Sequence, residues 1–148
     1  MQTTIYLSGE IHSDWREQIL AGIKSHDLPV DVLTPVTNHG ASDNVGTDIL
    51  GPAGSPFWKD NQSAKINSVR IKTAIEKADI VVVKFGEKYR QWNAAFEAGY
   101  AVAKGKSLIT IHPPELTHPL KEVDASAQAV AETPRQVVEI LKYITTQA

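Results

Sequence analysis

The sequence predicts a single α/β domain with a parallel sheet of about five strands and helices on both faces, in a flavodoxin-like or Rossmann-like order. Three observations support this prediction. The chain has 148 residues, close to the size of one average domain. Short runs of β-forming residues alternate with helical patterns, which is typical of βαβ units. Residues 79–85 are almost continuously apolar, as in a strand that is buried on both faces of a sheet.

The first part of the chain predicts two strands and one helix. A β-rich run at residues 3–8 predicts the first strand. Asp14, followed three residues later by Glu17, is typical of a capping box, and apolar residues at helical spacing behind it predict a helix that ends near His26. A short apolar run at residues 30–34 predicts the second strand.

Residues 36–61 predict a long loop. This segment contains four glycines and two prolines among Asn, Asp, Ser and Thr residues. A loop of this length in a compact domain is usually either disordered or functional. Because Phe57 and Trp58 can anchor its end to the domain, we expect an ordered lid over a ligand site.

The rest of the chain predicts three further helices and three further strands. The helices are expected at residues 63–78, at residues 92–104 and from Pro134 onwards, and the strands at residues 79–85, 107–112 and 128–131. Thr133 and Gln136 are spaced as the N-cap and capping-box residues of the last helix. Ligands of such sheets bind beyond the carboxyl ends of the strands, so the residues that follow the strands are the candidates for a site.

Composition and charge exclude several classes of protein. The formal net charge is −2, with 15 basic and 17 acidic residues, so there is no electrostatic footprint for a nucleic-acid polymer. The absence of cysteine excludes disulfides, thiolate catalysis and thiolate metal sites. No apolar run approaches the roughly 20 residues that span a bilayer, and the first residues do not resemble a signal peptide. We therefore expect a cytoplasmic protein without a membrane partner.

The sequence also lacks motifs for cofactors and metal ions. Gly9 is not followed by the further glycines of a dinucleotide fingerprint, and neither a P-loop nor a nucleophile-elbow serine is present. The five histidines form no metal-binding pattern along the chain: His12, His26, His39, His112 and His118. We expect neither a cofactor nor a metal ion.

A glutamate on a predicted helix is the strongest candidate for chemistry. Asn93, Glu97 and Tyr100 stand at positions i, i+4 and i+7, on one helical face. The neighbours of Glu97 are small or apolar, and they can desolvate its carboxylate near the strand ends and make it a nucleophile or a base. The alternative is a glutamate that faces solvent and pairs with a lysine.

The same helix carries small residues at every fourth position, namely Ala95, Gly99 and Ala103. Such a stripe allows another backbone to come close. Packing against the sheet would explain it, and a subunit interface is the alternative.

Several segments resemble the nucleoside 2-deoxyribosyltransferase superfamily. Four segments match it in order and spacing: residues 6–9, 78–83, 95–101 and 105–106. Three segments more closely resemble the YtoQ family, a branch of that superfamily: residues 67–70, 89–96 and 118–122. The resemblance extends over nearly the whole chain.

The resemblance implies an enzyme that cleaves or transfers the N-glycosidic bond of a nucleoside, nucleotide or related riboside. Glu97 matches the nucleophile that attacks the anomeric carbon, and Tyr6 matches the tyrosine beside it. We expect Trp58 or Trp92 to stack on a ring of the substrate. The other expected binding residues are Ser8, Gly9, Glu10, Arg70, Gly86, Gln91, Trp92 and Asn93. The superfamily completes its site from a neighbouring subunit, which implies a homo-oligomer, either a dimer or a tetramer.

Two positions depart from the superfamily pattern. Ile71 stands where members commonly have a carboxylate that manages the leaving base, and Gln91 stands where well-known members have Asp or Ser. The neighbouring Arg70 suits a phosphate or a carboxylate. These departures leave a second hypothesis open, a non-catalytic nucleotide-binding or sensing module that keeps the pocket. A third hypothesis is a hydrolase on another substrate with His39 or His12 as its base.

Overall fold

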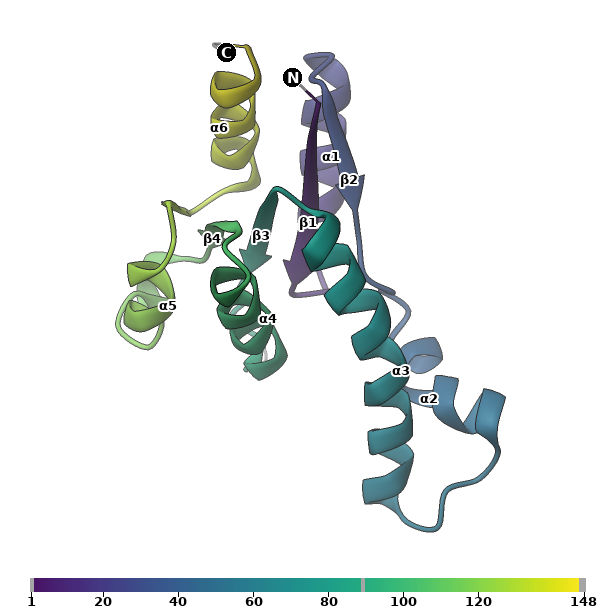
Figure 1. The fold of residues 1–148 in the computed structure, drawn as a ribbon. Coiled ribbons are helices and arrows are strands. Elements are labelled where there is room, and N and C mark those ends of the chain that lie inside the picture. Colours follow the sequence, from purple (N-terminus) through teal and green to yellow (C-terminus); the bar gives the residue numbers. More distant parts are fainter. Residues whose placement is uncertain (1, 89, 147–148) are drawn as a thin grey trace.

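A parallel sheet forms the centre of the protein (Figure 1). The computed structural model describes residues 2–88 and 90–146. Five strands pair in the order β2-β1-β3-β4-β5, and all four pairings are parallel. The strands are β1 (Thr3–Gly9), β2 (Val30–Leu33), β3 (Ile80–Lys84), β4 (Ser107–Ile111) and β5 (Ala129–Ala131). The predicted fold class and the flavodoxin-like order are confirmed.

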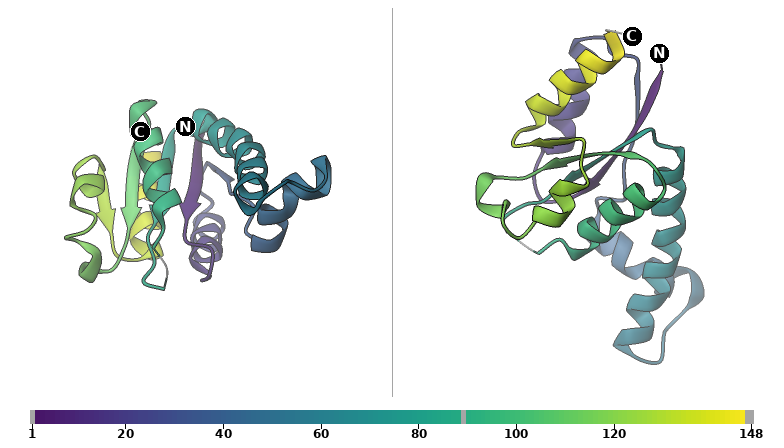
Figure 2. Two further views of the ribbon diagram at one scale, coloured as in Figure 1. Left: turned by 90° about the horizontal axis from the view of Figure 1, so that it is seen from below. Right: turned by 60° about the vertical axis from the view of Figure 1, so that its left-hand side comes forward.

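Helices cover both faces of the sheet (Figure 2). They are α1 (Trp15–Ser25), α2 (His39–Leu50), α3 (Pro56–Lys77), α4 (Trp92–Ala103), α5 (Lys121–Ala125) and α6 (Pro134–Thr146), with a 3₁₀ turn at Pro114–Leu116. Helices α1 and α6 pack on one face of the sheet, and α3, α4 and α5 pack on the other. No helix in residues 2–88 and 90–146 combines the length and the apolar character that are needed to cross a membrane.

Alternation along β1 decides which side chains reach the α3–α4 face. Ile5 and Leu7 join the apolar cluster with α1 and α6, whereas Tyr6 joins the cluster with α3 and α4. Ser8 follows Tyr6 by two residues and therefore lies on the same face of the sheet as Tyr6. The pleat thus directs a phenol and a hydroxyl from β1 toward the layer that contains α4.

The two predicted capping boxes have different outcomes. At α6, Thr133 Oγ1 accepts a hydrogen bond from the Gln136 N–H, and Gln136 Oε1 accepts one from the Thr133 N–H, so this box is confirmed. The box at α1 is wrong, because the Asp14 side chain does not bond the helix backbone and instead accepts from Gln18 Nε2 at 2.8 Å.

The predicted long loop at residues 36–61 is wrong. Residues 39–50 form α2, and α3 begins at Pro56, seven residues before the predicted residue 63. Caps begin both helices: Asn38 Oδ1 accepts from the Ala41 N–H, and Ser55 Oγ accepts from the Trp58 N–H. Helix α2 is poor in helix formers, so packing against α3 stabilises it more than propensity does. Figure 1 shows that α2 and the first half of α3 extend beyond the carboxyl ends of the strands.

Candidate active site

A partly buried carboxyl and a buried phenol meet where the strand order reverses. Strand β1 has β2 on one side and β3 on the other, and crevices at such reversals are where open α/β sheets bind ligands. Tyr6 of β1 is 1% exposed, and its hydroxyl donates a hydrogen bond to Glu97 Oε1 at 3.2 Å. The α4 helix therefore presents Glu97 inward to the sheet, which excludes the alternative of a solvent-facing glutamate paired with lysine.

Burial is the main influence on the ionisation of this pair. Desolvation raises the pKa of Glu97 above that of an ordinary glutamate, and the hydrogen bond from Tyr6, the Ser8 hydroxyl and the Arg16 charge oppose that rise. Desolvation and the nearby Glu97 charge also raise the pKa of Tyr6, so its phenol stays neutral and remains a donor. Such a carboxylate is incompletely solvated and can act as a nucleophile or a base once it is ionised.

Ser8 is fully buried next to this carboxyl. Its hydroxyl lowers the pKa of Glu97, although no hydrogen bond of standard geometry forms to Ser8 Oγ from any described residue. A buried hydroxyl without a settled partner is available to the carboxyl. Ser8 does not line either of the cavities described below.

Arg16 is a site residue that sequence analysis missed. It is 4% exposed, and its guanidinium donates to the carbonyl oxygens of Leu7, Gly9 and Glu10, with distances of 3.1, 3.1 and 2.6 Å. It thereby fixes the end of β1 and places a positive charge that favours the ionised Glu97. An arginine in the first turn of an amphipathic helix gives no sequence signal of this role.

The turn after β1 uses Glu10 for structure. Its carboxylate accepts hydrogen bonds from the His12 N–H and from Ser13 Oγ, the latter at 2.6 Å. Glu10 is 6% exposed and borders the cavity described below. These contacts satisfy much of the carboxylate and make it a turn-stabilising group.

Gly86 and Gln91 shape the segment that leads into α4. The Gln91 Oε1 atom accepts from the Gly86 N–H at 2.8 Å, so this amide oxygen closes the turn. A Cβ atom on Gly86 would lie 2.7 Å from Glu10 Cγ, which explains why glycine is needed there.

Glu97 faces a cavity of about 670 Å³, a size typical of small-molecule sites. Of the expected binding residues, the walls include Gly9, Glu10, Gln91, Trp92 and Asn93. Helix α2 contributes His39, the candidate base of the third hypothesis. Helices α2 and α3 also contribute residues that were not expected at the site: Ser42, Asp43, Asp60, Ser63, Asn67 and Lys72. Residues of the segment that was predicted to be a lid therefore contribute to the wall as part of a helix.

Arg70 and Trp58 lie outside this cavity. Arg70 borders a second cavity of about 400 Å³, where Tyr6, Asn67 and Ile71 also lie. Trp58 is 56% exposed and packs edge-on against Phe57 with ring centroids 4.9 Å apart. Of the two tryptophans that were expected to stack on substrate, Trp92 borders the cavity with Glu97.

Two other features of α4 differ from their expected roles. Tyr100 points to α3, where its hydroxyl donates to Glu76 Oε1 at 3.2 Å, so it is not part of the site. Only Ala95 of the small-residue stripe packs against the core cluster on this face of the sheet, whereas Gly99 and Ala103 are exposed. The α4 residues buried in that cluster are Ala94, Ala98 and Ala101.

The histidines divide between the cavity and the core. His12 and His39 border the cavity. His112 is buried, with Nε2 placed 2.7 Å from Asp124 Oδ2, and this pair joins β4 to α5. The described residues hold no group of three or more His, Cys, Asp or Glu side chains arranged to bind a metal ion.

Solved structures with the same fold include nucleoside-processing enzymes. A conserved protein of Enterococcus faecalis V583 aligns with a TM-score of 0.62 and 15% identity over 97% of this chain and 99% of that chain. A 2-deoxyribosyltransferase of Bacillus psychrosaccharolyticus aligns with a TM-score of 0.55 and 19% identity over 91% of this chain and 90% of that chain. The CMP N-glycosidase BcmB of Clostridium botulinum aligns with a TM-score of 0.51 and 13% identity over 94% of this chain and 98% of that chain. The protein has the nucleoside 2-deoxyribosyltransferase-like form of the parallel α/β fold.

Sequence comparison defines the family more closely. Residues 6–145 match the family model described as nucleoside 2-deoxyribosyltransferase YtoQ. The uncharacterized protein YtoQ of Bacillus subtilis (strain 168) is 46% identical over 144 residues, which cover 97% of each chain. The chain belongs to the YtoQ family.

Proposed function

We propose that this protein is an enzyme that cleaves or transfers the N-glycosidic bond of a nucleoside, nucleotide or related riboside, with Glu97 as its nucleophile. The observation that carries this proposal is the partly buried Glu97 carboxyl, held by Tyr6 at the wall of a large cavity beside the strand-order reversal. The family supports it, as do the solved structures of a 2-deoxyribosyltransferase and a CMP N-glycosidase that share the fold.

The chemistry follows from the geometry of the pair. The ionised Glu97 attacks the anomeric carbon as the bond from that carbon to the base nitrogen breaks, which forms a glycosyl-enzyme. Tyr6 holds Oε1, which leaves Oε2 for the attack and limits the rotation of the carboxylate. Water or a second base then attacks the same carbon and releases Glu97.

The proposal is tested by the release of free base. Purified protein is incubated with ribonucleosides, deoxyribonucleosides and their 5′-phosphates, with and without a second free base, and the products are separated by chromatography. Released base identifies hydrolysis, and a new nucleoside identifies transfer. Intact substrates that nevertheless raise the melting temperature would instead support the nucleotide-binding module, which the apolar Ile71 and the engaged Gln91 amide oxygen favour.

Tyr6→Phe should move the acid limb of the pH–rate profile to higher pH. The hydrogen bond from Tyr6 lowers the pKa of Glu97, so its loss lets burial raise that pKa further, and ionised nucleophile appears only at higher pH. The measurement is kcat/KM against pH for wild type, Tyr6→Phe and Tyr100→Phe. Tyr100 bonds Glu76 instead and serves as the matched control. An unshifted acid limb in Tyr6→Phe would contradict the coupling.

Trp92→Ala should raise KM about tenfold, because base–aromatic stacking contributes roughly 1–3 kcal/mol. Trp58→Ala is the matched control: both side chains are largely exposed, but only Trp92 of this pair borders the cavity. Steady-state kinetics on the best substrate of the panel measures both variants. Equal effects of the two substitutions would argue against stacking at Trp92.

We also propose that the chain forms a homo-oligomer. Large apolar side chains are exposed on α4 and on the α2–α3 hairpin: Trp92, Phe96, Ile49, Leu50, Phe57 and Trp58. A surface of this kind commonly marks a protein interface. Light scattering should give a mass that is a multiple of 16.2 kDa, and a monomer mass would contradict the proposal.

A further inference from the structure

We propose that His39, paired with Asp43, is the proton donor to the departing base and the proton acceptor from the incoming water. This inference rests on the proposed function, because it gives that reaction a group that the Tyr6–Glu97 pair does not supply. The observation that carries it is a histidine–aspartate pair on α2 that borders the same cavity as Glu97.

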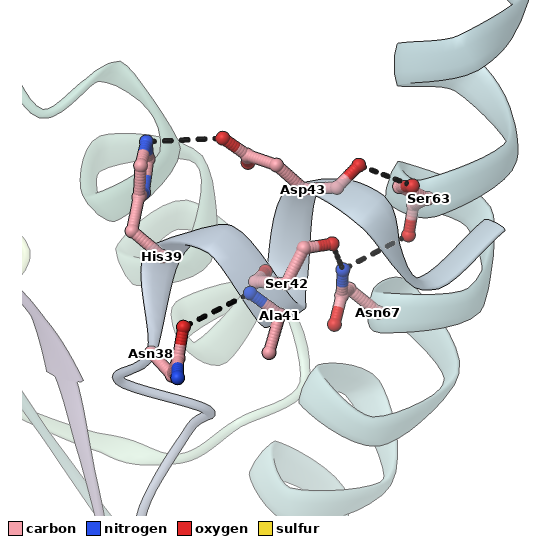
Figure 3. Close-up of polar contacts among 7 residues, drawn as sticks. All are labelled: Asn38, His39, Ala41, Ser42, Asp43, Ser63 and Asn67. Atoms are coloured by element: carbon pink, nitrogen blue, oxygen red, sulfur yellow. Dashed lines mark hydrogen bonds and ion pairs between the residues drawn. The ribbon is translucent and has the colours of Figure 1, made fainter. Parts of the chain in front are cut away.

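Contacts with α3 fix the turn of α2 that carries the pair (Figure 3). Ser63 is buried, and its hydroxyl donates to the Asp43 carbonyl oxygen at 2.7 Å and accepts from the Gly46 N–H at 3.0 Å. Asn67 Nδ2 donates to the Ser42 and Ser63 carbonyl oxygens, each at 3.0 Å. A fixed backbone at Asp43 is what a positioned acid–base group requires.

The pair has the form of a histidine oriented by a carboxylate. His39 Nε2 lies 3.1 Å from Asp43 Oδ2, one helical turn along α2, while the His39 side chain itself is 71% exposed. A carboxylate on one ring nitrogen fixes the tautomer and the orientation of the ring. The other nitrogen, Nδ1, is then the atom that exchanges a proton with the substrate.

The other candidates near the cavity are less suitable for this role. Glu10 is held by the His12 N–H and Ser13, Gln91 is a neutral amide, and Ile71 is apolar. His12 lies in the turn that Glu10 closes. Lys72 and Arg90 bring positive charge, and Asp60 brings negative charge, without an oriented histidine. His39 has both a proton-exchanging ring and a carboxylate that orients it.

The proton moves in two balanced steps. As Glu97 attacks the anomeric carbon, the electron pair of the breaking carbon–nitrogen bond goes to the base nitrogen, and the proton on His39 Nδ1 transfers to the base. The imidazole is then neutral. In hydrolysis it takes a proton from water as the water oxygen bonds the anomeric carbon, and the bond to Glu97 breaks to restore the carboxylate.

A leaving group that needs no proton tests this assignment. Wild type, His39→Gln, Asp43→Asn and Glu97→Gln are assayed on the best nucleoside of the panel and on the p-nitrophenyl glycoside of the same sugar. In His39→Gln, kcat/KM should fall about 10²-fold or more on the nucleoside, within the usual range for general acid catalysis. On the nitrophenyl glycoside it should fall less than about 5-fold. Asp43→Asn should show the same selectivity with a smaller loss. His26→Gln, at the end of α1, is the matched histidine control.

The outcomes separate this inference from the proposed function. If His39→Gln keeps full activity, or if its activity falls equally on both substrates, the proton-transfer role is overturned while cleavage through Glu97 stands. If Glu97→Gln keeps its activity, or if wild type cleaves neither substrate, the proposed function is overturned and the role of His39 falls with it. Melting curves of each variant check that a loss of activity is not a loss of fold.

Discussion

Glu97→Gln is expected to lower kcat/KM for base release by at least about 10³-fold, because the substitution removes the atom that bonds to the anomeric carbon. Glutamine keeps nearly the same shape, so Tyr6 can still donate to the side-chain oxygen at the position of Oε1. The measurement is base release by wild type and variant under identical conditions. Glu139→Gln on the exposed face of α6 is the matched control, and it should retain full activity.

The same substitution is expected to stabilise the fold near neutral pH. Burial raises the pKa of Glu97 in the folded state above its value in the unfolded chain, so the folded state binds this proton more tightly. Stability therefore falls as pH rises from the ordinary glutamate range through the raised pKa. Glutamine never ionises and avoids this cost. We expect the free energy of unfolding to rise by about 0.5–2 kcal/mol at neutral pH and this gain to disappear in acid, measured by thermal unfolding at several pH values.

Activity and stability that change in opposite directions would identify Glu97 as a functional group held at a cost to the fold. A variant that releases base as fast as wild type would overturn its role as nucleophile. A variant that loses stability at neutral pH would contradict the desolvation argument. The two measurements fail independently, so each can be judged by itself.

The sheet and most of its helices could be predicted because single patterns determine them. The apolar run of β3 and the Thr133–Gln136 box of α6 depend on residues close in sequence. Glu97 could be placed on the inner face of a helix from its small neighbours and the family resemblance. Its hydrogen bond to Tyr6 joins residues 91 positions apart and follows only from the packing of α4 on β1.

The α2 helix and the role of Arg16 could not be predicted, because tertiary contacts determine both. Helix α2 has a glycine at its point of contact with α3, where a Cβ on Gly46 would lie 2.6 Å from Gln62 Cβ. In the sequence this glycine resembles a turn residue, but in the structure it allows two helices to approach. Arg16 bonds three carbonyl oxygens that are six to nine residues earlier in the chain, and neither periodicity nor spacing reveals this contact.

Gly9→Ala is expected to be the most destabilising alanine substitution at a glycine of this chain. Gly9 has a φ angle of +108°, and a Cβ there would lie 2.2 Å from the Lys84 carbonyl oxygen. That carbonyl oxygen also accepts from the Glu10 N–H at 3.0 Å, so neither backbone can move without loss of this contact between the ends of β1 and β3. We expect the free energy of unfolding to fall by about 3–5 kcal/mol, measured by urea denaturation.

Gly105→Ala separates the two causes of that loss of stability, which are the left-handed backbone conformation and the contact with Lys84. Gly105 also has a positive φ angle, +75°, but a Cβ there would meet nothing within 4 Å. The unfolding free energy of Gly105→Ala should therefore fall by only about 1–2 kcal/mol, which is the cost of the left-handed conformation. A similar loss in both variants would mean that the backbone conformation, and not the contact with Lys84, requires glycine at position 9. A much larger loss of stability in Gly9→Ala would show that the close approach of β1 to β3 depends on the missing side chain. That approach sets the position of Ser8 and the Arg16 contacts beside Glu97.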